Sequence, residues 1–350
     1  MVSDTPPRTG AAQPVTDCVV DDAESGQKLL QFLERRLALP RPLLHRWIRT
    51  GQIRCNSSRC KPFQRIEAGD RIRLPPFAVR MSERQKSVAS GPEAAQGGFG
   101  TGGAGAVPRQ GACAVPFAAH GDLLAFRKPA GLPVHPGTGH EDSFAGRLES
   151  RYAGRPFMPT PVHRLDKDTS GLLLVAQTYA ALRAAHEAIR AHAVVKEYLA
   201  WVKGRWPYGD ERLIRHEMVR TGAPGRERMA ALHGAGPEIP CRTALCTMTP
   251  CARNDAATLL LVRLITGRTH QIRVQTADLG HPVVGDRKYG DGAGRNGRML
   301  LHAFRITLPD GHVFTCPPDW TGPWAVPMPL PATRAPLDTL QIIAPGENRG

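Results

Sequence analysis

The sequence predicts an α+β protein, in which a small α/β module precedes a large domain with a mixed, largely antiparallel sheet. Two observations support this prediction. Short apolar runs typical of buried strands outnumber the segments with helical periodicity, and a long glycine-rich stretch divides the chain into two parts. With 350 residues, of which 41% are hydrophobic, each part is long enough to bury a core of its own.

The small module is expected over residues 25–76. Leucines at helical spacing predict a first helix over 29–37, and a second apolar pattern predicts another helix over 43–51, where a glycine ends it. Alternating polar and apolar residues at 53–56 and 70–74 predict two short strands. The module is therefore two helices on a small sheet.

The charge of the chain is concentrated in this module. The net charge of the whole chain is +15, and residues 25–76 carry twelve Lys or Arg against three acids, a net +9. The polar side of the second helix presents Arg41, Arg46 and Arg49. An ordinary solvated basic face remains one interpretation. Because so many cations crowd one small unit, we predict instead that these arginines contact the phosphates of a nucleic acid.

Residues 77–118 are predicted to be a flexible linker. Eight glycines fall between Ser90 and Ala114, and such a segment buries too little apolar surface to offset its ordering entropy. The large domain is then expected over 119–330. Residues 1–24 and 331–350 are predicted to be a disordered N-terminal tail and a C-terminal tail.

The large domain is organised around a polar segment, 162–171, that runs directly into the apolar residues 172–176. The apolar run is typical of a strand buried on both faces, and a loop beside such a strand is a rigid support for a reactive side chain. The other elements are predicted as strands at 123–126, 196–203 and 258–264 and as a helix at 179–193.

The motifs of this domain resemble those of one enzyme family. Residues 163–176 read HRLDKDTSGLLLVA and match the signature HRLDxxTSGLLLVA of the RluA-type pseudouridine synthases. The segments KPAGLPVHP (128–136), TGRTHQIR (266–273), GHPVVGD (280–286) and LLHA (300–303) match further motifs of that family. The resemblance covers about 120–328, and the small module resembles the S4-type RNA-binding domain.

The resemblance implies the residues of a catalytic site. In the family, the aspartate that matches Asp166 is the nucleophile, and the arginine that matches Arg273 pairs with it. The tyrosine that matches Tyr198 stacks on the target base and is a candidate acceptor of the C5 proton. The residues alone leave a structural Asp–Arg pair and a core tyrosine as alternatives.

Three basic residues of the large domain are candidates for RNA contacts. The arginine that matches Arg164 enters the position vacated by the flipped base or binds the nucleotide's phosphate in the family, and plain phosphate binding is the alternative. Lys128 and Arg268 are assigned either to the RNA backbone or to a structural role. The two histidines near the site, His135 and His163, are given no chemical role.

The implied reaction converts uridine to pseudouridine. The C1′–N1 bond breaks, the base rotates and C5 rejoins the sugar, so the reaction needs neither cofactor nor metal. The base must first leave its stack. Attack of the aspartate at C1′ and elimination to a glycal after removal of the 2′ proton both remain open. The eight cysteines lack the C-x2-C spacing of a zinc site and are expected to be reduced thiols.

The expected partner is RNA, with large-subunit (23S) ribosomal RNA favoured over transfer RNA. No apolar run is long enough to cross a membrane, and the first residues lack the pattern of a secretory signal, so a cytoplasmic monomer is expected. A non-catalytic RNA-binding assembly factor is the alternative, and a uracil glycosylase would need a water-activating group that is not apparent. The joint presence of Asp166, Tyr198 and Arg273 favours the synthase.

Overall fold

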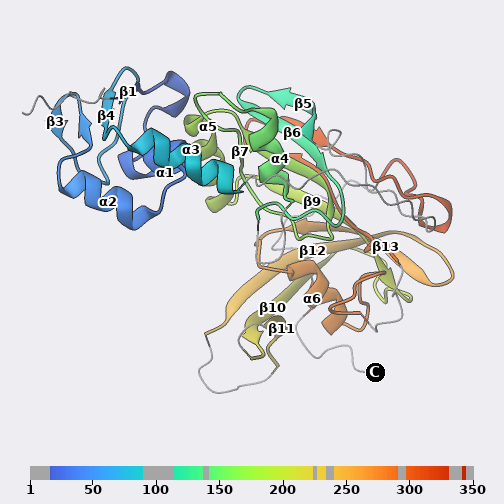
Figure 1. The fold of residues 1–350 in the computed structure, drawn as a ribbon. Coiled ribbons are helices and arrows are strands. Elements are labelled where there is room, and N and C mark those ends of the chain that lie inside the picture. The colour runs from blue at the N-terminus through green and yellow to red at the C-terminus, as the bar shows by residue number, and fades with distance from the viewer. Residues whose placement is uncertain are drawn as a thin grey trace, which may run out of the picture. The chain divides into compact units, whose positions relative to one another are not determined.

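The computed structural model describes residues 16–89, 114–136, 142–223, 227–233, 240–290, 297–330 and 341–343. The chain divides into two compact units (Figure 1). The first unit contains the chain up to Val107 together with the short pieces Gly154–Met158 and Thr178–Ala180, and the second contains the remainder. Each unit is described by itself.

The first unit is a small antiparallel sheet with helices on it. Its strand order is β1-β4-β2-β3. Strand β4 alternates as its sequence predicts, because Ile72 and Leu74 point into the core while Arg71 and Arg73 are exposed. The elements are β1 (Thr16–Val19), a 3-10 turn (Asp22–Glu24), α1 (Leu29–Leu37), α2 (Arg41–Arg49), β2 (Arg54–Cys55), β3 (Ser58–Arg59), β4 (Arg71–Leu74) and α3 (Ala78–Ala89).

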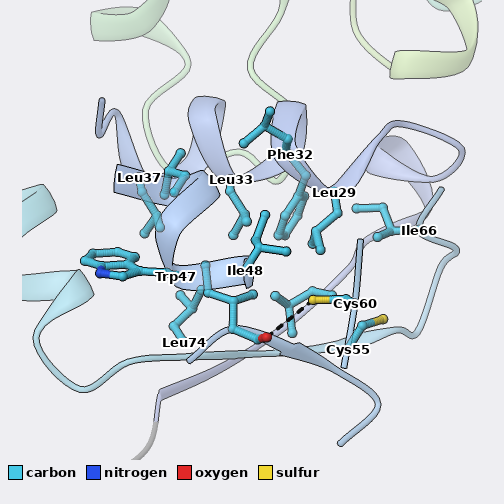
Figure 2. Close-up of a cluster of buried hydrophobic side chains, with 14 of the residues drawn as sticks. Leu29, Phe32, Leu33, Leu37, Trp47, Ile48, Cys55, Cys60, Ile66 and Leu74 are labelled. Atoms are coloured by element: carbon cyan, nitrogen blue, oxygen red, sulfur yellow. Dashed lines mark hydrogen bonds between the residues drawn. The ribbon is translucent and has the colours of Figure 1, made fainter. Parts of the chain in front are cut away.

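The core of this unit lies between its helices and its sheet. Leu29 and Leu33 from α1 meet Trp47 and Ile48 from α2 above the sheet, as Figure 2 shows. Cys60 is buried there, and its thiol donates a hydrogen bond of 3.3 Å to the carbonyl of Ile53. Burial raises the pKa of this thiol, so it stays protonated and packs as a small apolar side chain.

Two predicted boundaries of this unit are wrong. The predicted N-terminal tail, 1–24, includes β1, whose Thr16–Val19 pair along their whole length with β4, and the turn that Asp21 caps. Four-residue strands carry little periodicity, and their partner decides whether they form. The predicted linker, 77–118, begins with helix α3 and ends inside a strand of the second unit. Its glycine-rich part, 90–113, lies outside the described residues.

The second unit is a large mixed sheet, which confirms the predicted fold class. The strand order is β11-β10-β12-β13-β9-β14-β8-β6-β5, with β15 beside β14, β16 beside β10 and β7 beside β8. Among the described strands, the pairs β8–β14 and β10–β16 are parallel and the other pairs are antiparallel. The strands are β5 (Pro116–His120), β6 (Leu123–Lys128), β7 (Thr160–Pro161), β8 (Ser170–Ala176), β9 (Val195–Lys203), β10 (Arg212–Thr221), β11 (Arg228–Ala231), β12 (Arg242–Arg253), β13 (Ala257–Leu264), β14 (Leu301–Thr307), β15 (Val313–Thr315) and β16 (Ile342–Ile343).

Few helices accompany this sheet. They are α4 (Phe144–Arg151), α5 (Tyr179–Arg190) and α6 (Gln271–Asp278), with a 3-10 turn at Gly322–Trp324. Helix α6 lies beside β10 and β11 (Figure 1), and its Gln275 side chain donates to the main-chain carbonyl of Ala244 in β12. Among the described residues, no helix is long and apolar enough to span a lipid bilayer.

Strand β8 supports the polar segment that the sequence singles out. All seven of its residues are buried. Gly171 has φ +112°, and a Cβ there would overlap the carbonyl oxygen of Ala303 and lie only 2.7 Å from its amide nitrogen. A side chain at this position would therefore push β14 away from β8. The glycine lets the two parallel strands approach closely at the start of β8, just after the polar segment.

The end of the chain corrects a third boundary. Ile342 and Ile343 form β16 and pair in parallel with Leu213 and Ile214 of β10. The predicted C-terminal tail, 331–350, is therefore wrong at these residues. A two-residue strand exists only because its partner offers a free edge, so the local pattern gives no sign of it. Residues 331–340 and 344–350 lie outside the described part of the chain.

Candidate active site

A cavity of about 330 Å³ opens where the polar segment meets the loop before α6. Most of its lining comes from residues 162–166 with Thr169, from Lys196 and Tyr198 on β9, and from residues 264–265 and 267–273. The remainder is Ile189, His192 and Leu301. The cavity therefore unites segments more than 100 residues apart in the chain. It brings together the three residues predicted to be catalytic.

Asp166 and Arg273 are in direct contact. Nη1 of Arg273 donates a hydrogen bond of 3.1 Å to Oδ2 of Asp166, whose side chain is 18% exposed and so can meet a ligand. The main-chain carbonyl of Asp166 accepts a bond from the amide of Thr169, which closes the loop. Arg273 lies in the first turn of α6, which follows directly on the cavity-lining loop, and it reaches the carboxylate from there.

Arg273 is itself held by a second carboxylate, Asp286. Nε and Nη2 of Arg273 donate to the two oxygens of Asp286 at 2.7 and 2.9 Å. The Asp286 side chain is fully buried and also accepts bonds from the amides of Lys288 and Tyr289. This fork-to-fork pair fixes the plane of the guanidinium and leaves Nη1 aimed at Asp166.

The two carboxylates keep Arg273 charged. Burial alone lowers the pKa of the guanidinium, but the bonds to Asp286 and the charge of Asp166 raise it above its ordinary value. Burial likewise raises the pKa of Asp286, and its bonds to Arg273 outweigh this and hold that pKa below the ordinary value. No role was predicted for Asp286, although it ends the matched segment GHPVVGD. Its presence as an acid within a family motif was the signal that could have identified it.

Tyr198 lies on β9 and lines the cavity. Its side chain is buried, and burial together with the charge of Asp166 raises its pKa above the ordinary value. The phenol is therefore neutral at physiological pH. The neighbouring Leu199 and Trp201 belong to a hydrophobic cluster of the sheet.

Lys128 has a structural position. Its side chain is fully buried, and its ammonium donates to the carbonyls of Pro129, Leu132 and Lys167 at 2.8, 2.7 and 2.9 Å. Of the two roles assigned to Lys128, this burial argues against contact with an RNA backbone and favours the structural one. The bond to Lys167 ties the loop after β6 to the residue next to Asp166.

The two predicted basic residues at the cavity differ in exposure. Arg164 is exposed and lines the cavity. Arg268 is half-buried, and its Nε donates a 3.0 Å bond to the carbonyl of Thr243. Arg164 is thus the better placed of the two to meet an anionic ligand. Arg41, Arg46 and Arg49 belong to the first unit and are exposed on α2.

Two histidines that contact β8 are neutral supports. Nε2 of His163 accepts the amide of Leu174 in β8, and burial with the nearby Lys196 charge lowers its pKa to about 3. His302 joins Ser170 of β8 to the carbonyl of Cys316, and burial lowers its pKa to about 4. Both rings therefore brace β8, the strand that follows the Asp166 loop, without carrying charge.

Two further groups of the site were missed by the sequence analysis. Nε2 of His270 lies 3.8 Å from Oδ2 of Asp166, and its Nδ1 lies 2.8 Å from the hydroxyl of Tyr289. The ring of Tyr289 also faces the guanidinium of Arg273, with 5.1 Å between the Cζ atom and the ring centroid. In the described part of the chain, no group of three or more His, Cys, Asp or Glu side chains is arranged to hold a metal ion.

Comparison with known proteins shows which family the chain resembles. Residues 122–278 match the family described as RNA pseudouridylate synthase. The ribosomal large subunit pseudouridine synthase C of Escherichia coli strain K12 is 36% identical over 295 residues, which cover 80% of this chain and 84% of that protein. The enzyme of the same name from Haemophilus influenzae is 34% identical over 300 residues, covering 82% and 85%.

Solved structures give the same result. The human RNA pseudouridylate synthase domain containing 1 superposes with a TM-score of 0.51 at 29% identity, covering 61% of this chain and 86% of that one. The two bacterial enzymes match over most of both chains. The chain belongs to the RNA pseudouridylate synthase family.

Proposed function

We propose that this protein converts uridines of large-subunit (23S) ribosomal RNA to pseudouridine, with Asp166 as the reacting carboxylate. The observation that carries the proposal is the chain of contacts from Asp286 through Arg273 to Asp166 at the cavity. Several relatives are named as large-subunit ribosomal enzymes, which supports this RNA as the substrate.

Asp166 begins the reaction in either of two ways. Its free oxygen attacks C1′ as the C1′–N1 bond breaks, or it removes the 2′ proton and leaves a glycal. Both steps need an anionic carboxylate in a fixed direction. Arg273 supplies the direction and a compensating charge, and the buried Asp286 prevents the guanidinium from turning away.

The cavity suits an extruded base. Its volume of about 330 Å³ lies within the usual range for small-ligand sites. Tyr198 offers a flat neutral surface beside Asp166 on which the freed uracil can stack and turn. Arg164, exposed at the cavity, is placed to meet the phosphate of the flipped nucleotide or to fill the space that the base leaves.

The first unit supplies additional RNA affinity in this proposal. Arg46 and Arg49 are exposed on α2 and line a shallow groove with His45 and Lys61. Phosphates of structured RNA would release counterions on binding there. We expect the protein to act as a monomer in the cytoplasm, which light scattering of the purified protein and localisation of the tagged protein would test.

One assay tests the proposed activity. RNA carrying tritium at uridine C5 is incubated with the protein, and the release of tritium is followed. Release from ribosomal RNA that disappears in Asp166→Asn supports the synthase. If neither ribosomal nor transfer RNA releases tritium, a non-catalytic RNA-binding factor takes its place. Mapping pseudouridines in RNA from a deletion strain then identifies the substrate positions, and loss at transfer RNA positions alone would refute the ribosomal assignment.

A further inference from the structure

His270 has an uncommon backbone conformation at the cavity. It precedes α6 with φ +56° and ψ +23°, in the left-handed region that few residues other than glycine adopt. Such strain persists only where the surroundings fix it, and it often marks a functional position. Here it directs the imidazole between Asp166 and Tyr289.

The contacts of Tyr289 and Asp166 favour one position for the proton of His270. The Tyr289 hydroxyl oxygen already accepts the amide of Met229 at 3.2 Å, and its own proton remains available for Nδ1 of His270 at 2.8 Å. The imidazole then bears its proton on Nε2, which faces Asp166. The opposite tautomer would point the Nε2 lone pair at a carboxylate, which is repulsive.

The charges around the two rings favour this arrangement. Burial lowers the pKa of His270; Asp166 and Asp286 oppose this effect, and the cations Arg273 and Lys288 reinforce it. The imidazole is therefore neutral at physiological pH. Burial raises the pKa of Tyr289, so its hydroxyl keeps the proton that it donates.

We propose that Tyr289 and His270 form a hydrogen-bond relay that positions Asp166 for the reaction. Arg273 Nη1 and His270 Nε2 both face Oδ2 of Asp166. In the relay, the other oxygen of Asp166, Oδ1, therefore contacts the substrate. His270 is a positioning residue, and its role rests on the proposed function. The 3.8 Å separation exceeds a hydrogen bond in the free protein, and catalytic contacts of this kind tighten when substrate binds.

Mutation of the relay tests its effect on catalysis. Tyr289→Phe removes only the hydroxyl and keeps the ring that faces Arg273. We expect kcat for tritium release to fall about tenfold, as for the loss of one hydrogen bond to a charged group, with KM for RNA unchanged. His270→Ala should lose a similar factor, and the double variant should lose no more than His270→Ala alone, because Tyr289 acts through His270. His270→Gln, which keeps a side-chain N–H, should recover part of the loss.

Matched substitutions away from the cavity give the baseline. Tyr208→Phe and His312→Ala alter residues that do not line it and should leave kcat unchanged. Full activity of Tyr289→Phe, or losses that multiply in the double variant, would overturn the relay.

A second measurement is independent of activity. In ¹⁵N-histidine NMR spectra of the full chain, assigned with His270→Ala, the His270 ring should be neutral with its proton on Nε2, and this preference should weaken in Tyr289→Phe. A proton on Nδ1 in the unmodified protein would refute the relay even if the enzyme were active. Conversely, if the proton lies on Nε2 but the protein releases no tritium from any RNA, the relay stands and the proposed function is refuted.

Discussion

The fully buried carboxylate of Asp286 accepts two hydrogen bonds from Arg273, at 2.7 and 2.9 Å. Arg273 is consequently paired with two carboxylates, of which Asp166 lines the cavity and Asp286 does not. The orientation of the Asp166 carboxylate thus depends on a buried residue that does not line the cavity.

Asp286→Asn should reduce both stability and activity. The amide keeps the shape of the side chain but leaves Arg273 with one carboxylate, and breaking a buried pair in this way costs about 3 kcal/mol. Urea unfolding should show that loss, and tritium release should fall even at temperatures where the variant is fully folded. Asp319→Asn, which disrupts an exposed ion pair with Arg298, is the control and should change neither quantity. A folded Asp286→Asn variant with unchanged kcat would contradict the role given to Asp286.

Gly171→Ala should destabilise the second unit strongly. The added methyl would collide with the backbone of Ala303, which cannot yield without separating β8 from β14. Gly311→Ala is a matched control, since Gly311 also has positive φ, +86°, but has nothing within 4 Å of the added atom. We expect about 1 kcal/mol for the control and several times more for Gly171→Ala in thermal unfolding. Equal costs would mean that backbone conformation, and not the close approach of the strands, demands glycine.

Lys128→Met should separate its structural role from an RNA contact. The substitution leaves three carbonyls without their donor, and we expect the free energy of unfolding to fall by about 3 kcal/mol. The salt dependence of RNA binding should not change. Arg164→Gln is the counterpart at the cavity and should weaken RNA binding with little effect on stability. A lower salt slope in Lys128→Met with normal stability would restore the RNA-contact interpretation.

His302 should make the protein sensitive to mild acid. Burial lowers its pKa from 6.5 to about 4, so the unfolded chain takes up a proton at a higher pH than the folded one does. Its contribution is fully present above pH 6.5 and is lost as the pH falls toward 4, by a total of about 3 kcal/mol. Unfolding free energies measured across this window should fall less steeply in His302→Gln. Parallel curves for the two proteins would show that His302 does not have the lowered pKa.

The elements that the sequence predicted best are those that bury a continuous apolar run. Strand β8 is fully buried, and β13 lies within a residue of its predicted limits, because burial on both faces leaves a pattern that needs no knowledge of the partner. The short strands β1 and β16 leave no such pattern, since pairing with β4 and β10 alone makes them strands.

The residues of the site also divide into those that a sequence pattern predicts and those that depend on a partner elsewhere in the fold. Motif resemblance predicted Asp166, Tyr198 and Arg273, which lie on three separate segments and line one cavity. The supporting contacts depend on which loops meet after folding, and local sequence does not record that. Helix α6 is an example, because Gln271, Arg273 and Gln275 are buried and hydrogen-bonded although they break any apolar stripe.

The arginines of α2 should contribute to RNA affinity through counterion release. In the full chain, the double variant Arg46→Ala/Arg49→Ala should lower the slope of log affinity against log salt by about 1.4 to 1.8, one increment for each phosphate that is no longer neutralised. Arg41 is a weaker candidate, because Glu34 already pairs with it at 3.2 Å. The control is the double variant Arg183→Ala/Arg220→Ala in the second unit. These two exposed arginines, like Arg41, already have acidic partners, so their loss should leave the slope unchanged. If both double variants lower the slope equally, net charge and not a phosphate-binding face on α2 governs the affinity.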